Sequence, residues 1–260
     1  MTIQGVESIG FIGSGRAASF MLEGFTQANL EAIFILADKD PAASARLASR
    51  FPFARDAGSG VSAACSSNVL FLAVPPQQTI AVFKDISRLL KPVSMVVSLA
   101  PKVTLSELSE FHPDGPVARF LPSAPSALGF GYNPVCYAPN IETRTRNAVQ
   151  ELLRCLGDAP EVAEAELEAY AILTAMGPTY LWPILTTLKQ LGAEFGLDAV
   201  AARHAVASMA EGAARLFGDV RKSEDTIADM IPSRPLAQDM PGFLEILRER
   251  LRILYDKLRP

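Results

Sequence analysis

Short apolar runs alternate with amphipathic stretches through the first half of the chain. We predict strands at residues 9–12, 32–37, 69–74, 94–99, 117–121 and 135–138, separated by helices that include residues 17–27, 41–51 and 78–90. The strands are mostly apolar and do not alternate regularly between apolar and polar positions. Such strands, alternating with helices, are typical of a parallel sheet that helices cover on both faces.

The pattern changes near Glu142, beyond which no further strand is indicated. Helices are predicted at residues 142–156, 163–195, 198–217, 224–230 and 242–258, with a break in the second at Gly177 and Pro178. Gly196 fits a helix C-cap and Asp198 fits the next N-cap. We therefore predict an α/β Rossmann-type N-terminal domain over residues 1–160, followed by an all-α C-terminal dimerisation domain over residues 161–260.

Composition and charge exclude several classes of partner. The chain has 260 residues, of which 49% are apolar, and a net charge of −4. This length suffices for two hydrophobic cores, and a mildly acidic chain repels nucleic-acid phosphates. No signal-peptide pattern and no membrane-spanning run is present, so we expect a cytoplasmic protein that does not bind membranes. The three cysteines and two histidines are scattered, so we expect no disulfide and no metal site.

A glycine-rich loop joins the first predicted strand to the first predicted helix. Its GxGxxA pattern gains meaning from that position. The first glycine permits a tight turn, the second lets a pyrophosphate approach the backbone, and the alanine lets the helix pack on the sheet. The helix N-terminus also attracts phosphate. We assign six loop residues to the binding of a dinucleotide cofactor: Gly13, Ser14, Gly15, Arg16, Ala17 and Ala18. The alternative is a purely structural turn.

Asp38 ends the second predicted strand, 20 residues after Ala18. A carboxylate there accepts hydrogen bonds from the adenosine ribose and repels a 2′-phosphate. Lys39 is adjacent and offsets part of that repulsion. We therefore predict NAD or NADP as cofactor, with NAD preferred. The alternative for Asp38 is a turn or helix cap.

The segment after the third predicted strand is also expected to border the cofactor. In open α/β sheets, ligands bind at the carboxyl ends of the strands, near the point where the strand order reverses. The residues assigned on this ground are Ala73, Val74, Pro75, Pro76 and Ala100, with Ser98 and Leu99 beside the last. Each proline is equally compatible with a structural turn.

Taken together, these segments resemble the pyrroline-5-carboxylate reductase family over about residues 8–217. IGFIGSGRAASFMLEGF resembles the opening strand, loop and helix of that family, and FLAVPPQ resembles its AVKPQ segment. VVSLAPKVTLSEL is similar to its fourth strand and following helix, and VARFLPSAPSALGFG to its RxMPNxPxxxGxG stretch. AMGPTYLWP and the helices after it resemble the SGPAY helix, GL turn and GAA-containing helix.

The resemblance implies a reductase that converts a cyclic imine to proline with NADPH or NADH, and hence a place in proline biosynthesis. It also implies helical domains that interlock into a homodimer. The apolar side chains Leu181, Trp182, Leu185 and Leu188 independently indicate an association surface. We expect a homodimer, or a larger homo-oligomer, formed through about residues 165–217.

Several positions depart from the family pattern. Pro75 replaces the lysine of AVKPQ, Ser123 the asparagine of MPN, Met176 the serine of SGPAY, and Thr179 its alanine. The SPGGTT substrate loop is replaced by Ile231–Leu236, in which two prolines lack amide hydrogens. We therefore expect weak or absent reduction of pyrroline-5-carboxylate and a preference for another small acceptor.

Few polar side chains remain as candidates for the chemistry. Ser123 and Thr179 are assigned as catalytic, and Arg234 and Tyr180 as substrate-binding, Arg234 because a guanidinium can clamp a carboxylate. Lys189 is read as a solvent-facing helix residue. Two functions stay open. The first is a reductase of an imine or carbonyl of a small substrate, with pyrroline-5-carboxylate as one candidate. The second is a dinucleotide-binding protein that has lost catalysis and acts as a sensor or interaction partner.

Overall fold

A seven-stranded sheet forms the centre of the computed structural model, which describes residues 1–259. The strand order is β3-β2-β1-β4-β5-β6-β8, and every pairing is parallel except that of β6 with β8. The strands are β1 (Ser8–Ile12), β2 (Ile33–Ala37), β3 (Ala54–Asp56), β4 (Val69–Leu72), β5 (Met95–Ser98), β6 (Val117–Phe120) and β8 (Val135–Tyr137). The predicted Rossmann-type domain is confirmed, and the strand order reverses between β1 and β4.

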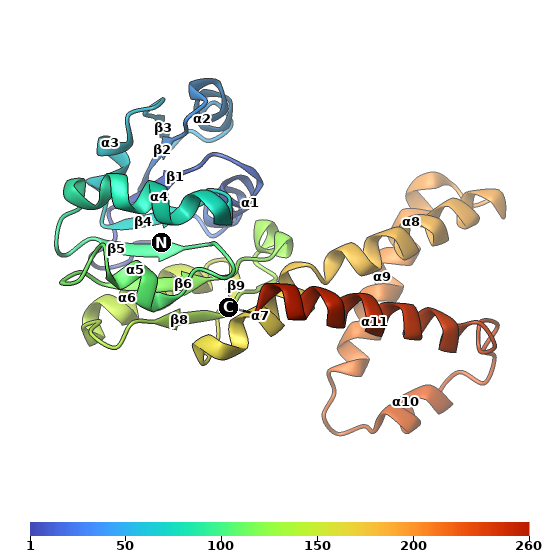
Figure 1. Cartoon of the computed structure of the whole chain (residues 1–260). Coiled ribbons are helices and arrows are strands. Elements are labelled where there is room, and N and C mark those ends of the chain that lie inside the picture. Colours follow the sequence, from blue (N-terminus) through green and yellow to red (C-terminus); the bar gives the residue numbers. More distant parts are fainter. Residues whose placement is uncertain (260) are drawn as a thin grey trace. The chain divides into compact units, whose positions relative to one another are not determined.

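Helices cover both faces of this sheet (Figure 1). One core contains residues of α1 (Arg16–Gln27), α2 (Pro41–Ala48) and α6 (Thr143–Arg154). The opposite core contains residues of α3 (Val61–Cys65), α4 (Pro76–Ile86), α5 (Leu105–Ser109) and α7 (Leu167–Tyr170). Covering on both faces explains why the central strands are apolar at consecutive positions.

Phenylalanines fill the core between the sheet and α1. The Phe11 and Phe71 rings stack with centroids 5.0 Å apart, and Phe25 stacks on Phe34 at 5.8 Å. Each of the four is at most 1% exposed, and full burial of such a side chain stabilises a fold by about 1.5–3 kcal/mol. This core fixes β1 and α1, and hence the loop between them.

Some elements were not predicted. β3 is a short edge strand of sequence Ala-Arg-Asp, and α3 is a five-residue helix. A two-stranded sheet pairs β7 (Gly131–Tyr132) with β9 (Gly157–Asp158). These segments are too short or too polar to give an apolar period, because tertiary contacts rather than pattern define them.

The chain divides into two compact units, the first comprising Met1–Met176 together with residues 255–259. This unit therefore continues past residue 160. After the sheet it contains a 3-10 turn at Glu164–Glu166, then α7 and a π-helical stretch at Ala171–Ala175. Such π-helical segments occur often at functional sites.

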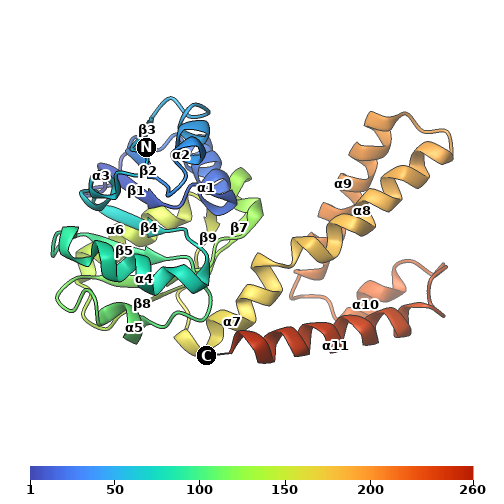
Figure 2. The same cartoon turned by 45° about the horizontal axis from the view of Figure 1, so that its top comes forward.

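The second unit, Gly177–Leu254, is helical, as predicted for this half of the chain. Its elements are α8 (Pro178–Glu194), α9 (Ala199–Phe217), α10 (Glu224–Asp229) and most of α11 (Met240–Leu258). Figure 2 shows α8 and α9 side by side. The turn between them is as predicted: Gly196 has φ +90°, and the Asp198 carboxylate accepts hydrogen bonds from the backbone N–H groups of Val200 and Ala201. Among residues 1–259, no helix is long and apolar enough to cross a membrane.

Candidate active site

A cavity of about 1060 Å³ opens at the carboxyl ends of the central strands, within the first unit. On the β1–β2 side it is lined by Gly13, Gly15, Arg16, Ala17, Asp38, Lys39 and Ser59. On the β5–β6 side it is lined by Leu99, Pro101, Leu121, Pro122, Ala171, Ala175 and Met176. Its position at the reversal of strand order is where open α/β sheets bind dinucleotides, and its volume is at the upper end of what is usual for ligand and cofactor sites.

Gly13 and Gly15 have different roles in the loop. Gly13 has φ +100°, and a Cβ there would lie 2.5 Å from the Ala73 carbonyl oxygen, so its absent side chain is a requirement of the fold. A Cβ at Gly15 would meet no atom within 4 Å. The space beside Gly15 is therefore open to the cavity, as approach of a pyrophosphate to the backbone requires.

The start of α1 is suited to anion binding. Gly15 is its N-cap, and none of residues 1–259 provides a side-chain hydrogen bond to this helix end. The first turn of a helix has N–H groups without intrahelical acceptors and the positive end of the helix dipole. Arg16 is exposed at this end and lines the cavity. Phosphate oxygens fit this arrangement of donors and charge.

Asp38 connects the glycine loop to the end of β2. Its Oδ2 accepts a hydrogen bond from the Ser14 N–H at 2.7 Å, and its Oδ1 accepts one from the Asp40 N–H at 2.9 Å. Carboxylate oxygens have further lone pairs, so both can still accept from ribose hydroxyls. Asp38 thus has a structural contact in addition to its place in the cavity lining.

The remaining residues assigned to the cofactor fall into two groups. Ala73, Val74 and Pro75 line the cavity. Of the others, Ser14 donates its N–H to Asp38, Ala18 is fully buried, Pro76 begins α4, and Ala100 is 1% exposed between the lining residues Leu99 and Pro101. These four are not among the lining residues, and their contact with a cofactor stays a prediction.

The β5–β6 end of the cavity is apolar, and most of it was missed from the sequence. Leu121, Pro122, Ala171 and Ala175 gave no polar or spacing signal, and Met176 was noted only as a departure from the family pattern. On α4, Gln78, Val82, Asp85 and Ile86 also line the cavity. Their spacing of three to four residues places them on one helix face, which was the available signal.

Ser123, assigned as catalytic, lies outside the cavity lining and is 2% exposed. Its hydroxyl donates to Asn133 Oδ1 at 3.1 Å, and its backbone N–H donates to the same oxygen at 2.9 Å. The Ser126 hydroxyl donates to that oxygen as well. The structure therefore shows Ser123 in a buried network that shapes the turn after β6, and a catalytic role for it stays a prediction.

Thr179, Tyr180 and Arg234 belong to the second unit. Burial raises the pKa of the Tyr180 phenol, a shift that favours its protonated form. Arg234 is exposed and its Nη2 donates to the Ala228 carbonyl oxygen at 2.8 Å and to Asp229 Oδ1 at 3.2 Å. Their assigned roles stay predictions.

No group of three or more histidine, cysteine, aspartate or glutamate side chains suited to a metal ion occurs in residues 1–259. Cys65 and Cys136 are buried, and desolvation raises their thiol pKa values to about 11 and about 12. Both are therefore protonated at neutral pH and behave as small apolar residues.

A doubly wound sheet with a GxGxxA turn facing a cavity is the architecture of dinucleotide-dependent oxidoreductases. Comparison with known proteins agrees. Residues 8–102 match the family described as NADP oxidoreductase coenzyme F420-dependent. The chain is 26% identical to pyrroline-5-carboxylate reductase of Corynebacterium melassecola over 220 residues, which cover 83% of this chain and 81% of that protein.

Two further comparisons extend over nearly the whole chain. Pyrroline-5-carboxylate reductase of Escherichia coli is 25% identical over 254 residues, which cover 96% of this chain and 91% of that protein. The crystal structure of Plasmodium falciparum pyrroline carboxylate reductase with NADP bound superposes with a TM-score of 0.79 at 17% identity, covering 99% of this chain and 98% of the other. The resemblance to the pyrroline-5-carboxylate reductase family is confirmed.

Proposed function

We propose that this protein is an NAD(P)H-dependent reductase that reduces an imine or related carbonyl of a small substrate. The observation that carries the proposal is the open space at Gly15, between a helix start that no side chain among residues 1–259 caps and a cavity that extends to an apolar end. Similarity to reductases over most of the chain supports the same function.

In this proposal each part of the cavity has a chemical task. The glycine loop and the start of α1 hold the pyrophosphate, and Asp38 holds the adenosine ribose. The cofactor, when bound, supplies a hydride. Leu99, Leu121 and Met176 surround the opposite end with apolar surface, which excludes water from the reacting centre. The lining residues at that end carry no titratable group, so the proton must come from another side chain or from water.

Turnover of a panel of cyclic imines and small keto acids tests this proposal. Oxidation of NADH or NADPH is followed optically, and a reductase is expected to reach a kcat/KM of about 10⁴ M⁻¹s⁻¹ or more with at least one acceptor. Tight dinucleotide binding without oxidation by any acceptor would instead favour the catalytically degraded binding protein. If the protein bound neither NADH nor NADPH, both the reductase and the dinucleotide-binding protein would be excluded as its function.

Within NAD(P) use, we propose that NADH is preferred. Asp38 lines the cavity beside the expected adenosine ribose, and its negative charge opposes a 2′-phosphate, whereas Lys39 and Arg16 reduce that opposition. Asp38→Asn is the suitable variant, because it removes the charge while the amide oxygen can still accept the Ser14 N–H, although the hydrogen bond from the Asp40 N–H is lost. The ratio of NADPH to NADH affinity is expected to rise in this variant. An unchanged ratio would contradict a role for the Asp38 charge.

Assembly as a homodimer, or as part of a larger homo-oligomer, is the expected solution state. Among the described residues of the second unit, the only fully buried apolar side chain is that of Ala202. Leu181 and Trp182 are 59% and 51% exposed, and Phe195 is 79% exposed. A helical unit with so little internal core needs another surface to cover it. Light scattering should therefore give a mass of at least two chains, and a monomer at micromolar concentration would refute the proposal.

The acceptor is expected to differ from pyrroline-5-carboxylate. Ile231–Leu236 cannot provide an unbroken run of amide donors, because Pro232 and Pro235 have no N–H and only Ser233 and Arg234 lie between them. We expect Arg234 to bind the carboxylate if the acceptor is an acid. The cytoplasmic location rests on the sequence and stays a prediction.

A further inference from the structure

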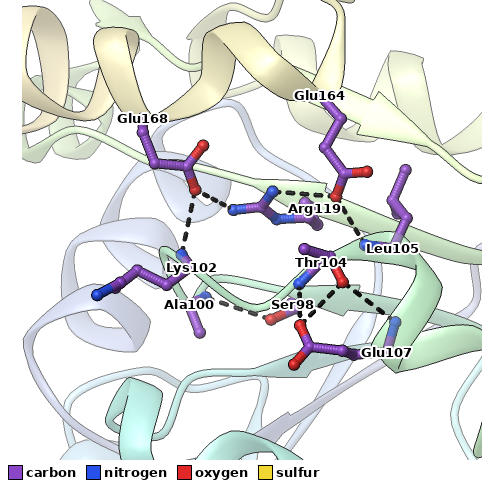
Figure 3. A network of polar contacts seen from close by, with 9 residues as sticks. All are labelled: Ser98, Ala100, Lys102, Thr104, Leu105, Glu107, Arg119, Glu164 and Glu168. Atoms are coloured by element: carbon purple, nitrogen blue, oxygen red, sulfur yellow. Dashed lines mark hydrogen bonds and ion pairs between the residues drawn. The ribbon is translucent and has the colours of Figure 1, made fainter. Parts of the chain in front are cut away.

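A buried arginine takes part in hydrogen bonds that connect three segments of the chain that contribute residues to the cavity lining. Arg119 lies on β6 and is 0% exposed. Its Nη1 donates to Glu164 Oε1 at 3.0 Å, and its Nη2 donates to Glu168 Oε1 at 2.5 Å. The Glu168 side chain is 2% exposed, and the Glu164 side chain is 34% exposed. Figure 3 shows the guanidinium between the two carboxylates.

The same two carboxylate oxygens also accept backbone hydrogen bonds from the segment that follows β5. Glu168 Oε1 accepts the Lys102 N–H at 3.1 Å, and Glu164 Oε1 accepts the Leu105 N–H at 2.6 Å. Lys102 has φ +70°, a conformation that residues with side chains rarely adopt. We call Arg119, Glu164, Glu168 and these two amides the arginine network; it links strand β6, the segment after β5, and the helical segment from Glu164.

Three residues of the arginine network lie within three residues of the cavity lining. Pro101 is adjacent to Lys102, Leu121 is two residues beyond Arg119, and Ala171 is three residues beyond Glu168. These lining residues all belong to the apolar end of the cavity. The adenosine end, with Asp38 and Gly15, lies on the other side of the strand reversal and has no contact with the network among the hydrogen bonds of residues 1–259.

The arginine network is not explained by its contribution to the stability of the fold alone. Buried ion pairs lose hydration that their attraction only partly offsets, and well-packed apolar residues of similar size often stabilise a fold as well. A fork of guanidinium and carboxylates, by contrast, fixes direction as well as distance. Here it orients two carboxylates, of which Glu168 accepts the N–H of Lys102, where φ is positive, and Glu164 accepts the N–H of Leu105.

We propose that Arg119 is a positioning residue for the nicotinamide end of the cofactor, an inference that rests on the proposed reductase function. Through Glu164 and Glu168 it sets the separation between the Pro101 wall and the Ala171 wall. The nicotinamide ring inserts between these walls and its reactive face is thereby fixed toward the acceptor. The adenosine half of the cofactor binds without help from the network.

Binding of two ligands to the same variants tests this proposal without requiring turnover. NADH contains the nicotinamide, whereas ADP-ribose contains only the adenosine, pyrophosphate and ribose parts. Glu168→Gln removes one charge of the network and keeps the side-chain shape, and Arg119→Lys keeps a charge but loses the fork. If Arg119→Lys fails to fold, the triple variant Arg119→Met with Glu164→Gln and Glu168→Gln removes the charges together and leaves no unpaired carboxylate.

The Kd for NADH is expected to rise at least fivefold in Glu168→Gln, whereas the Kd for ADP-ribose stays within twofold of the original. Any kcat measured at saturating NADH should also fall. An equal loss of affinity for NADH and for ADP-ribose would show that the network has only a general structural role, which would contradict the proposal. Unchanged NADH binding would also refute it. If the unsubstituted protein binds ADP-ribose and NADH with no turnover, only the proposed reaction fails; if it binds neither, the proposed function and this inference both fail.

Two controls separate positioning from the effects of substitution as such. Glu107→Gln lies in the capping box that starts α5, close to the same segment, and retains a side chain able to cap. Arg50→Gln removes an arginine from an exposed ion pair with Glu23 in the same unit. Both controls should leave the ratio of NADH to ADP-ribose affinity unchanged.

Discussion

Substitution of the second loop glycine separates binding from folding. In Gly15→Val the new side chain enters space that contains no protein atom within 4 Å of the Cβ position. The backbone there has φ −85° and ψ −159°, an extended conformation that valine accepts. Valine is a poorer N-cap than glycine, which costs up to about 1 kcal/mol. The unfolding free energy should therefore fall by no more than that amount.

Dinucleotide binding should respond far more strongly. The branched side chain occupies the position from which a pyrophosphate approaches the backbone, so we expect NADH affinity to fall at least tenfold, or about 1.4 kcal/mol. Fluorescence titration gives the affinity, and urea unfolding monitored by circular dichroism gives the stability.

Gly13→Ala is the matched comparison in the same loop. Its Cβ would lie 2.5 Å from the Ala73 carbonyl oxygen at φ +100°, so this variant should lose about 1–3 kcal/mol of stability through backbone strain. Unchanged NADH binding in Gly15→Val would refute the assignment of the loop. A large stability loss in Gly15→Val would mean that the glycine is needed for the fold instead.

Three other outcomes are expected. Gly24→Ala places a Cβ 2.1 Å from the Ser126 carbonyl oxygen and should cost about 1–3 kcal/mol in urea unfolding; an unchanged midpoint would contradict the packing of α1. Burial lowers the pKa of His112 below its ordinary 6.5, so as pH falls below about 6.5 the unfolded state takes up the proton first and stability is lost. His112→Gln should remove this part of the pH dependence. If the unfolding free energies of the variant and the original protein changed with pH in parallel, the proposed contribution of His112 would be wrong. Arg234→Ala should raise the KM for an acidic acceptor about tenfold, the loss of about 1.4 kcal/mol expected for a charged hydrogen bond, and an unchanged KM would exclude the carboxylate clamp.

Most of the fold could be predicted from the apolar runs and from the positions of glycine and capping residues in the sequence. The apolar runs located the central strands, and Asp198 with Gly196 located the α8–α9 turn within one residue. The same signals gave the β1–β2 side of the cavity, because its residues follow strand ends or form the GxGxxA turn. Both kinds of signal depend on local sequence.

The apolar end of the cavity could not be predicted in the same way. Leu121 and Ala171 belong to segments 50 residues apart in the chain, and an apolar lining residue looks like any core residue. Arg119 lies within a run of apolar strand residues, where one charged side chain gives no indication of its partners. Glu164 and Glu168 lie four residues apart on what reads as a solvated helix face, although Glu168 is buried.

A diffraction measurement on crystals grown with NADPH or NADH tests the central claim most directly. The pyrophosphate is predicted to lie against Gly15 and the start of α1, the adenosine ribose beside Asp38, and the nicotinamide between Pro101 and Ala171. Density for a bound dinucleotide elsewhere on the chain, or for a nicotinamide directed away from the Pro101 and Ala171 walls, would contradict the account.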